Sequence, residues 1–270
     1  MKIAFIGTGT MGEVMISALL RQKLVSPADI FACDVDEKRL GIVEQAYSIE
    51  CGPDSRSAIR GRDLVVLSVK PQTAASVAGG LKGEIKEGQL ALSIMAGTRI
   101  ETLRQALRHE SIVRAMPNTP AKFGQGMTVW TATRMVSQGQ KDMARAVLGA
   151  MGKEIYVEDE KYVDMATAVS GSGPAYAFMI MESLIDAGVH IGLPRAIASE
   201  LVYQTFLGSA HMARESGLHP AQLKNLVTSP GGTTAEGLLR MEDGGVRSAL
   251  AEAVIAAYEK AQLLGKESSK

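Results

Sequence analysis

Two glycine-containing turns hold the residues of this sequence that are best suited to bind a charged ligand. In the first, "GTGTMG" places Gly7, Gly9 and Gly12 in the pattern Gly-x-Gly-x-x-Gly, between a strand-like run and a helix-like run. The first glycine permits a tight turn, the second lets a pyrophosphate approach the backbone, and the third allows close helix packing. We interpret this turn as a dinucleotide-binding loop. A loop that binds an adenosyl sulfonium, as in methyltransferases, is the alternative.

The second turn, "VTSPGGTT" at 227–234, lies between two helix-like runs. Thr233 and Glu236 have the spacing of a capping box, which predicts a helix that starts at Thr233 or Thr234 and ends near Gly244. The first N–H groups of such a helix favour an anion such as a carboxylate, and the Thr234 hydroxyl adds a polar contact. On local grounds, a plain connector between helices explains the same glycines and proline equally well.

Further candidates follow the predicted strands, where ligands bind in open parallel sheets. They lie in "KPQ" at 70–72, "AGT" at 96–98 and "PNTP" at 117–120. Lys70 brings a cation, the "AGT" loop permits close approach of a ring, and Asn118 offers a donor and an acceptor. Taken singly, each is also explained as a solvated or turn-forming residue. Together, we expect them to line one rim of a binding site.

Asp34 closes the second predicted strand, where an acid accepts hydrogen bonds from an adenosine ribose. A carboxylate there favours NAD over NADP, because it repels a 2′-phosphate. Lys38 and Arg39 lie one turn further on and could offset that charge, so the preference stays open. The structural alternative for Asp34 is a helix N-cap.

The rim shows few groups for acid–base chemistry. No Ser-His-Asp set, paired carboxylates or activated cysteine lies near it, and the two cysteines and four histidines lack metal-ligand spacing, so we expect no metal. Reduction of a carbonyl normally requires a Lys, His or Tyr donor. Hydride transfer to a protonated imine depends more on orientation and a dry pocket. The pattern therefore favours imine reduction.

The elements that must position these residues change in kind near residue 160. Before it, helical patterns alternate with strand-like runs, which predicts a mainly parallel, doubly wound α/β domain of the Rossmann type at 1–160. After it, helices punctuated by Pro and Gly predict an all-α domain at 161–270. The expected strands are 2–7, 29–34, 64–69, 89–95, 111–116, 127–132 and 154–158.

Composition narrows the possible partners. Twenty-nine basic and 29 acidic residues give a net charge of zero, which argues against nucleic acid or an anionic membrane as partner. The longest apolar segment, 165–181, is interrupted by Gly171, Gly173 and Pro174 and is a poor membrane span. The first residues show no secretion signal, so we expect a cytoplasmic protein. A small all-α module this rich in Ala, Leu, Ile and Met often completes its core with a second copy, which predicts a homodimer.

Several motifs of the sequence resemble those of a known family. "FIGTGTMGE", "SVKPQ", "RAMPNTPA", "SGSGPAYAFMIMESLIDAGVHIGLPR" and "HPAQLKNLVTSPGGTTAEGLL" are similar to Δ1-pyrroline-5-carboxylate reductase, from the first strand to the last helix. The resemblance implies a Rossmann domain followed by an interlocking helical dimerisation domain, often in a ring of dimers. It also implies hydride transfer from NADPH or NADH to pyrroline-5-carboxylate, giving L-proline in the last step of proline biosynthesis.

The resemblance and the rim loops together give the expected site. The catalytic candidates are Thr234, whose hydroxyl faces the ring nitrogen or carboxylate, and Lys70. The expected cofactor contacts are Gly7, Thr8, Gly9, Thr10, Met11, Gly12, Asp34, Ser55, Ser68, Val69, Lys70, Pro71, Ala96, Gly97 and Asn118. The "SGSGP" segment at 170–174 is expected near the nicotinamide. The expected substrate contacts are Ser172, Gly173, Gly231, Gly232, Thr233 and Thr234.

The sequence departs from the family pattern at two positions, and several alternative functions stay open. Many members that prefer NADPH carry Ser, Arg or Thr in place of Asp34, and some have Asn where this chain has Leu226, one place after Asn225. A methyltransferase would share the first loop without needing the helical domain, and a non-catalytic cofactor sensor would keep the whole scaffold. A reductase of another cyclic imine or a 3-hydroxyacid is the nearest enzymatic rival. The hydroxyacid enzymes use a lysine on the interdomain helix, and this chain has none between Ser170 and Gly188.

Overall fold

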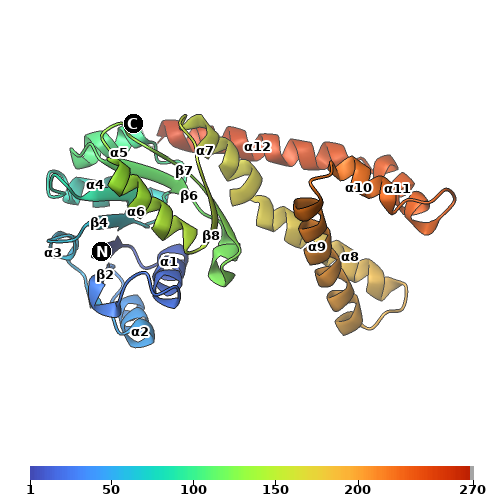
Figure 1. Ribbon diagram of the computed structural model, residues 1–270, viewed down its shortest axis with the longest axis horizontal. Coiled ribbons are helices and arrows are strands. Elements are labelled where there is room, and N and C mark those ends of the chain that lie inside the picture. Colours follow the sequence, from blue (N-terminus) through green and yellow to red (C-terminus); the bar gives the residue numbers. More distant parts are fainter. Residues whose placement is uncertain (268–270) are drawn as a thin grey trace. The chain divides into compact units, whose positions relative to one another are not determined.

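The computed structural model describes residues 1–267, apart from the side chains of Pro71 and Glu267. The chain forms two compact units (Figure 1). The first comprises Met1–Pro174 together with the residues from Ala256 onward, and the second comprises Ala175–Ile255. The expected boundary after residue 160 marks instead where strands give way to helices, since the last strand ends at Tyr156. The division into a dinucleotide-binding domain at 1–160 and a dimerisation and substrate-binding domain at 161–270 stays a proposal.

The first unit is built on one eight-stranded sheet with the strand order β3-β2-β1-β4-β5-β6-β7-β8. Strands β1 to β6 run parallel to one another, β7 runs antiparallel to β6, and β8 is parallel to β7. This confirms the mainly parallel, doubly wound sheet that the sequence predicts. The strands are β1 (Ile3–Ile6), β2 (Ile30–Cys33), β3 (Glu50–Gly52), β4 (Leu64–Leu67), β5 (Leu90–Ser93), β6 (Ile112–Met116), β7 (Gly126–Ala132) and β8 (Gly152–Tyr156).

Helices cover both faces of the sheet because alternate strand residues point to opposite sides (Figure 1). Ile3 and Phe5 pack in one core with α1 (Thr10–Arg21), α2 (Glu37–Tyr47) and α6 (Gln138–Gly149). Ala4 and Ile6 pack in the other core with α3 (Ser55–Ala58), α4 (Pro71–Gly80) and α5 (Ile100–Leu107). Because β1 to β6 are parallel, their carboxyl ends share one edge of the sheet. The expected rim residues follow the strands at that edge.

After β8 the chain is helical. A short helix α7 (Lys161–Ala166) leads into a π-helical turn, Thr167–Gly171, and then into α8 (Gly173–His190). The later helices are α9 (Arg195–Ser216), α10 (Pro220–Leu226), α11 (Thr233–Asp243) and α12 (Val246–Glu267).

Proline and glycine mark the helix ends largely as the sequence predicts. Pro174 and Pro220 lie in the first turns of α8 and α10, and Gly217 ends α9 in the left-handed conformation (φ 64°). Pro194 is the N-cap of α9, although proline is also typical of a first helical turn.

The second unit buries few of its apolar side chains. Of its described hydrophobic residues only Ile185 and Ala198 are buried, although α8 and α9 approach so closely that a Cβ on Gly188 would lie 3.1 Å from the Ala198 Cβ. Large apolar side chains such as Phe178 and Leu207 are exposed. This unit therefore lacks a core of its own. None of the described helices combines the length and apolarity that crossing a membrane requires.

Candidate functional site

The first glycine loop has the geometry of a phosphate cradle. Gly7 has φ 99°, and a Cβ there would lie 2.8 Å from the Ser68 backbone. A Cβ on Gly12 would lie 2.5 Å from the Gly7 carbonyl oxygen, so both positions require glycine. Gly9 is different: it is exposed, it is the N-cap of α1, and nothing lies within 4 Å of where its Cβ would be. The N-terminus of α1 is thus open to a ligand, and the loop fits the pyrophosphate of a dinucleotide.

Asp34 stabilises the glycine loop by hydrogen bonds. Its Oδ2 accepts hydrogen bonds from the Thr8 N–H (2.7 Å) and hydroxyl (2.9 Å), and its Oδ1 accepts from the Asp36 N–H (3.1 Å). Burial raises the pKa of the Asp34 carboxyl, but the hydrogen bonds from Thr8 and Asp36 outweigh that effect and the pKa is lowered. The N-cap of α2 is Asp36, which accepts from the N–H groups of Lys38 and Arg39. The N-cap alternative for Asp34 is therefore wrong.

A cation also lies against this loop. Arg39 Nε donates to the Thr8 carbonyl oxygen (2.6 Å), and its guanidinium pairs with Glu13 of α1. The other Glu13 oxygen accepts from the Tyr47 hydroxyl (3.1 Å). Lys38 is exposed. The structure thus fixes Arg39, and not Lys38, against the glycine loop.

The loop after β4 meets the glycine loop directly. The Ser68 hydroxyl donates to the Gly7 carbonyl oxygen (2.7 Å), and Val69 contacts the position of a Gly7 Cβ. Lys70 is exposed and is the N-cap of α4; Pro71 starts that helix, but its side chain lies outside the described part of the chain. Ser55, the first residue of α3, is half-buried. Of the predicted contacts, those at 68 and 69 are therefore joined to the first loop by packing.

The loop after β5 faces the end of α12 within the same unit. Gly97 has φ 72°, and a Cβ there would lie 2.7 Å from the Leu264 Cβ. Close approach of a helix thus already requires glycine at this position. Ala96 is half-buried. Contacts of these two residues with a cofactor stay a prediction.

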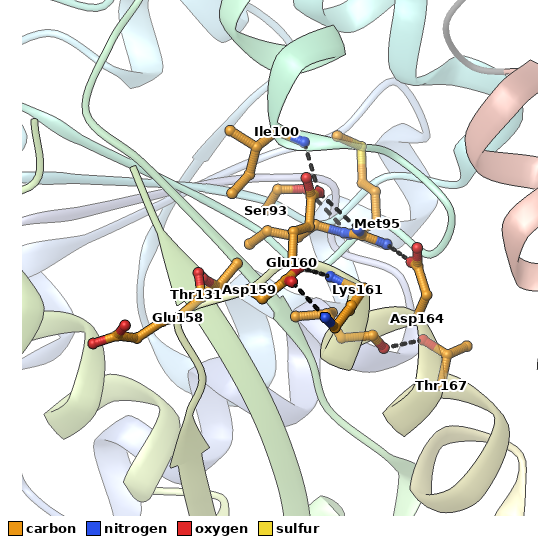
Figure 2. A network of polar contacts seen from close by, with 12 residues as sticks. Ser93, Met95, Ile100, Thr131, Glu158, Asp159, Glu160, Lys161, Asp164 and Thr167 are labelled. Carbon is orange, nitrogen blue, oxygen red and sulfur yellow. Dashed lines mark hydrogen bonds and ion pairs between the residues drawn. The ribbon is translucent and has the colours of Figure 1, made fainter. Parts of the chain in front are cut away.

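A buried arginine, which the sequence pattern alone did not single out, links the start of α5 to α7. Arg114 of β6 is 2% exposed and donates to Glu160 Oε1 (2.7 Å) and Asp164 Oδ1 (2.6 Å). Figure 2 shows these two carboxylates together with Ile100. The same Glu160 oxygen accepts from the Ile100 N–H at the start of α5 (2.9 Å). Arg114 interrupts an apolar strand, and that was the available signal, because a buried charge requires a partner.

Asn118 lies where β6 ends, and both atoms of its amide are engaged. Nδ2 donates to the Ser170 carbonyl oxygen (2.9 Å), and Oδ1 accepts from the Met127 N–H (2.8 Å). Ser170 belongs to the "SGSGP" segment, in which Ser172 and Gly173 are half-buried. The structure therefore brings the "PNTP" loop and this segment together.

The second glycine turn lies in the second unit. Gly231 has φ 67°, and Gly232 is the N-cap of α11, with no side chain capping the helix. The helix starts at Thr233 and ends at Asp243, close to the expected bounds, but the capping box of Thr233 and Glu236 is wrong because Thr233 is already helical. The first N–H groups of α11 thus have no side-chain cap and favour an anion. Thr234 is half-buried and Thr233 is exposed.

The cysteines take no visible part in chemistry. Both are free thiols, and burial, followed by nearby carboxylates, raises the pKa of Cys33 and of Cys51 to about 11. Each is therefore a protonated, weakly reactive thiol at neutral pH. Within residues 1–267, no group of three His, Cys, Asp or Glu side chains is arranged to hold a metal ion.

Comparison with known proteins adds a family to this geometry. The family model "Pyrroline-5-carboxylate reductase dimerisation" matches residues 160–264, and "NADP oxidoreductase coenzyme F420-dependent" matches residues 2–97. The chain is 41% identical over 266 residues to the pyrroline-5-carboxylate reductase of Synechocystis, covering 98% of this chain and 99% of that one. It is 38% identical to the enzyme of the same name from Glycine max, covering 97% and 95%.

Solved structures agree. A pyrroline-5-carboxylate reductase from Coxiella burnetii matches with a TM-score of 0.89 and 35% identity, covering 97% of this chain and 98% of that one. Pyrroline carboxylate reductase from Plasmodium falciparum, solved with NADP bound, matches with a TM-score of 0.90 and 32% identity, covering 98% of each chain. Likeness over the full length, at this identity, shows that the chain belongs to the pyrroline-5-carboxylate reductase family.

Proposed function

We propose that this chain reduces L-Δ1-pyrroline-5-carboxylate to L-proline with NADPH or NADH. The observation that carries the proposal is the open N-terminus of α1 at Gly9, in a chain similar over its full length to named reductases. A methyltransferase or a non-catalytic sensor would account for the glycine loop but not for that full-length similarity. Reduction of an imine also agrees with the small number of acid–base groups at the rim.

The first unit supplies the cofactor site in this proposal. The N–H groups of Thr10, Met11 and Gly12 at the start of α1 bind the pyrophosphate, as helix N-termini do. Asp34 and Arg39 lie on the adenosine side. The Asp34 carboxylate disfavours the 2′-phosphate of NADPH, and the Arg39 guanidinium favours it. The Plasmodium falciparum relative was solved with NADP, which supports a nicotinamide cofactor and leaves the NADH alternative to be measured.

The second glycine turn supplies the substrate carboxylate site in this proposal. Gly231 and Gly232 leave the first N–H groups of α11 accessible, and Thr233 and Thr234 add hydroxyl groups. Ser172 and Gly173 are the substrate contacts that the first unit supplies in this proposal. Lys70 places a positive charge at the cofactor edge, which favours anionic ligands.

The reaction balances without a strong acid from the protein. The cofactor, when bound, supplies a hydride to the imine carbon. The imine nitrogen carries its proton before transfer and keeps it as the secondary amine of proline. The task left to the chain is to orient the imine carbon toward the hydride and to exclude water. Thr234 serves by hydrogen bonding to the ring nitrogen or to the carboxylate.

We further propose that the working form is a homodimer in the cytoplasm, joined through the second unit. The match to a dimerisation family model and the exposed apolar side chains of that unit support the dimer. A ring of dimers is the larger assembly that the family resemblance suggests.

The direct test is to follow cofactor oxidation with pyrroline-5-carboxylate as substrate, in separate assays with NADPH and NADH. We expect turnover with at least one cofactor and formation of one L-proline for each cofactor oxidised, measured by amino-acid analysis. A cyclic imine without the carboxylate is the matched control substrate, and its KM should be at least about tenfold higher. No turnover with either cofactor would contradict the proposed function.

A further inference from the structure

The carbonyl group of Ser170 lacks the helical donor that its position would normally provide. In an α-helix this oxygen accepts from the N–H four residues later, but that residue is Pro174, which has no N–H. The preceding turn is π-helical, and the Ser172 N–H bonds five residues back to the Thr167 carbonyl oxygen (2.8 Å). π-Helical turns inside helical segments are frequent at functional sites. Ser170 therefore lacks the usual donor of an α-helix.

Asn118 supplies a donor in its place. Its Nδ2 lies 2.9 Å from the Ser170 oxygen, and its Oδ1 accepts from the Met127 N–H at 2.8 Å. These partners fix the orientation of the amide, because the flipped orientation would face a donor with a donor and an acceptor with an acceptor. Asn118 is 9% exposed, so loss of either bond would leave a buried backbone group unsatisfied.

The turn that Asn118 holds lies against the carboxyl end of β6. A Cβ on Gly171 would lie 3.2 Å from the Met116 Cε, so the backbone approaches the end of the strand closely. Ser172 and Gly173 follow directly, and they are proposed to contact the substrate. A shift of the Ser170 peptide would move both of these residues.

We propose that Asn118 is a positioning residue, which fixes the 170–173 turn by replacing the donor that Pro174 lacks and so sets where the imine lies relative to the nicotinamide. This inference rests on the proposed function. It replaces the expected cofactor contact of the Asn118 side chain, since both amide atoms are already bonded within the protein. Misplacement of reacting groups by about 1 Å can cost about a hundredfold in rate, so the effect should appear in kcat.

The variant Asn118→Asp tests this role, because it replaces the amide nitrogen with an oxygen and responds to pH. When ionised, the introduced carboxylate has no donor for Ser170 and places negative charge against a carbonyl oxygen. When protonated, the introduced carboxyl restores the pattern, with one oxygen accepting from Met127 and the O–H donating to Ser170. The Met127 N–H lowers the pKa of such a carboxyl, whereas burial and the facing carbonyl oxygen both raise it, and these two effects bring protonation toward the range in which the enzyme can be assayed.

We expect kcat of Asn118→Asp to be at least about tenfold below wild type at about pH 8, and the deficit to shrink as the pH falls toward about 5.5. The KM for the cofactor should change less than about twofold, because the glycine loop is untouched. Hydrogen exchange of the cofactor-free protein should show the same pattern. The Ser172 amide should exchange faster in the variant at high pH and approach wild type at low pH.

Gln89→Glu is the matched control. Gln89 is also 9% exposed, and its amide likewise bonds to backbone groups, those of Ile59, Arg62 and Lys86, but it precedes β5 at the amino edge of the sheet. We expect this variant to lower the thermal midpoint without a pH-dependent loss of kcat. An equal kcat loss in both variants, or unchanged exchange of Ser172 in Asn118→Asp, would overturn the positioning role. Absence of turnover in the wild type would overturn the proposed function instead, while the exchange experiment would still decide the contact.

Discussion

Asp34 shows how one carboxylate can shape a loop and also bear on ligand choice. Three hydrogen bonds, two from Thr8 and one from Asp36, fix the carboxylate at the carboxyl end of β2. Because these bonds stabilise the ionised form, the group remains negative at neutral pH. Arg39 of α2 contacts the same loop and carries the opposite charge. We therefore expect cofactor choice to depend on the balance between these two side chains.

Asp34→Ser should shift that balance toward NADPH. The shorter side chain removes the negative charge that we propose lies near the ribose, whereas the Arg39 guanidinium, which also pairs with Glu13, remains to attract a 2′-phosphate. We expect the ratio of kcat/KM for NADPH to that for NADH to rise about tenfold, which corresponds to ~1.4 kcal/mol. Asp36→Ser is the control, since serine also caps helices well and the Asp36 side chain accepts from the start of α2. An unchanged ratio in Asp34→Ser would show that Asp34 does not face the ribose.

At the scale of elements, the sequence predicts best what depends on local pattern. The apolar runs and the glycine spacing predict the strands and the loop at Gly9, because both follow from alternation and backbone freedom. The short strand β3 is missed, since three residues at the edge of a sheet carry too little pattern. The capping box at Thr233 is wrong because the preceding Gly232 already serves as the N-cap. The local spacing alone could not choose between these two starts.

Contacts between distant elements are the part that local pattern does not reveal. Arg114 can be recognised as a buried charge, but nothing near it in the sequence identifies Glu160 and Asp164 as partners. In the same way, the sequence shows Asn118 only as a polar residue after a strand. Its bond to the Ser170 carbonyl oxygen, to which Pro174 cannot donate, becomes evident only in the fold. Both cases require the fold before the partner can be named.

Arg114→Met should destabilise the first unit by about 3–5 kcal/mol, because it leaves two largely buried carboxylates without their cation. The loss should be measured as the change in free energy of unfolding in urea. Arg104→Met is the control. Arg104 also pairs with two carboxylates, those of Glu101 and Glu110, but it is 43% exposed, and it should cost no more than about 1 kcal/mol. Equal losses would show that the buried network adds nothing.

At the scale of the whole molecule, the two units differ in how much apolar surface they bury. The first has two cores on either side of its sheet, whereas the second leaves side chains from α8 and α9 exposed, including Phe178 and Leu207. Exposed apolar surface of this extent is typical of an interface. The exposed side chains of the second unit therefore support the proposed dimer.

Light scattering should give a mass of about twice 28.6 kDa or a multiple of that value. Leu207→Glu should shift the protein toward the monomer on dilution, because it would bury a charge without a partner. Met135→Glu changes a similarly exposed apolar residue of the first unit and should leave the mass unaltered. A wild-type protein that remains monomeric at high concentration would contradict the dimer.

The contact between Leu264 and the Gly97 loop has a consequence for the order in which the protein is made. Ribosomes deliver a chain from its N-terminus, so the whole sheet emerges before the end of α12. A nascent chain can therefore assemble its sheet while the loop after β5 is still uncovered. That loop receives its helical cover only when the last turns of α12 have been synthesised, so this part of the first unit is completed after its sheet.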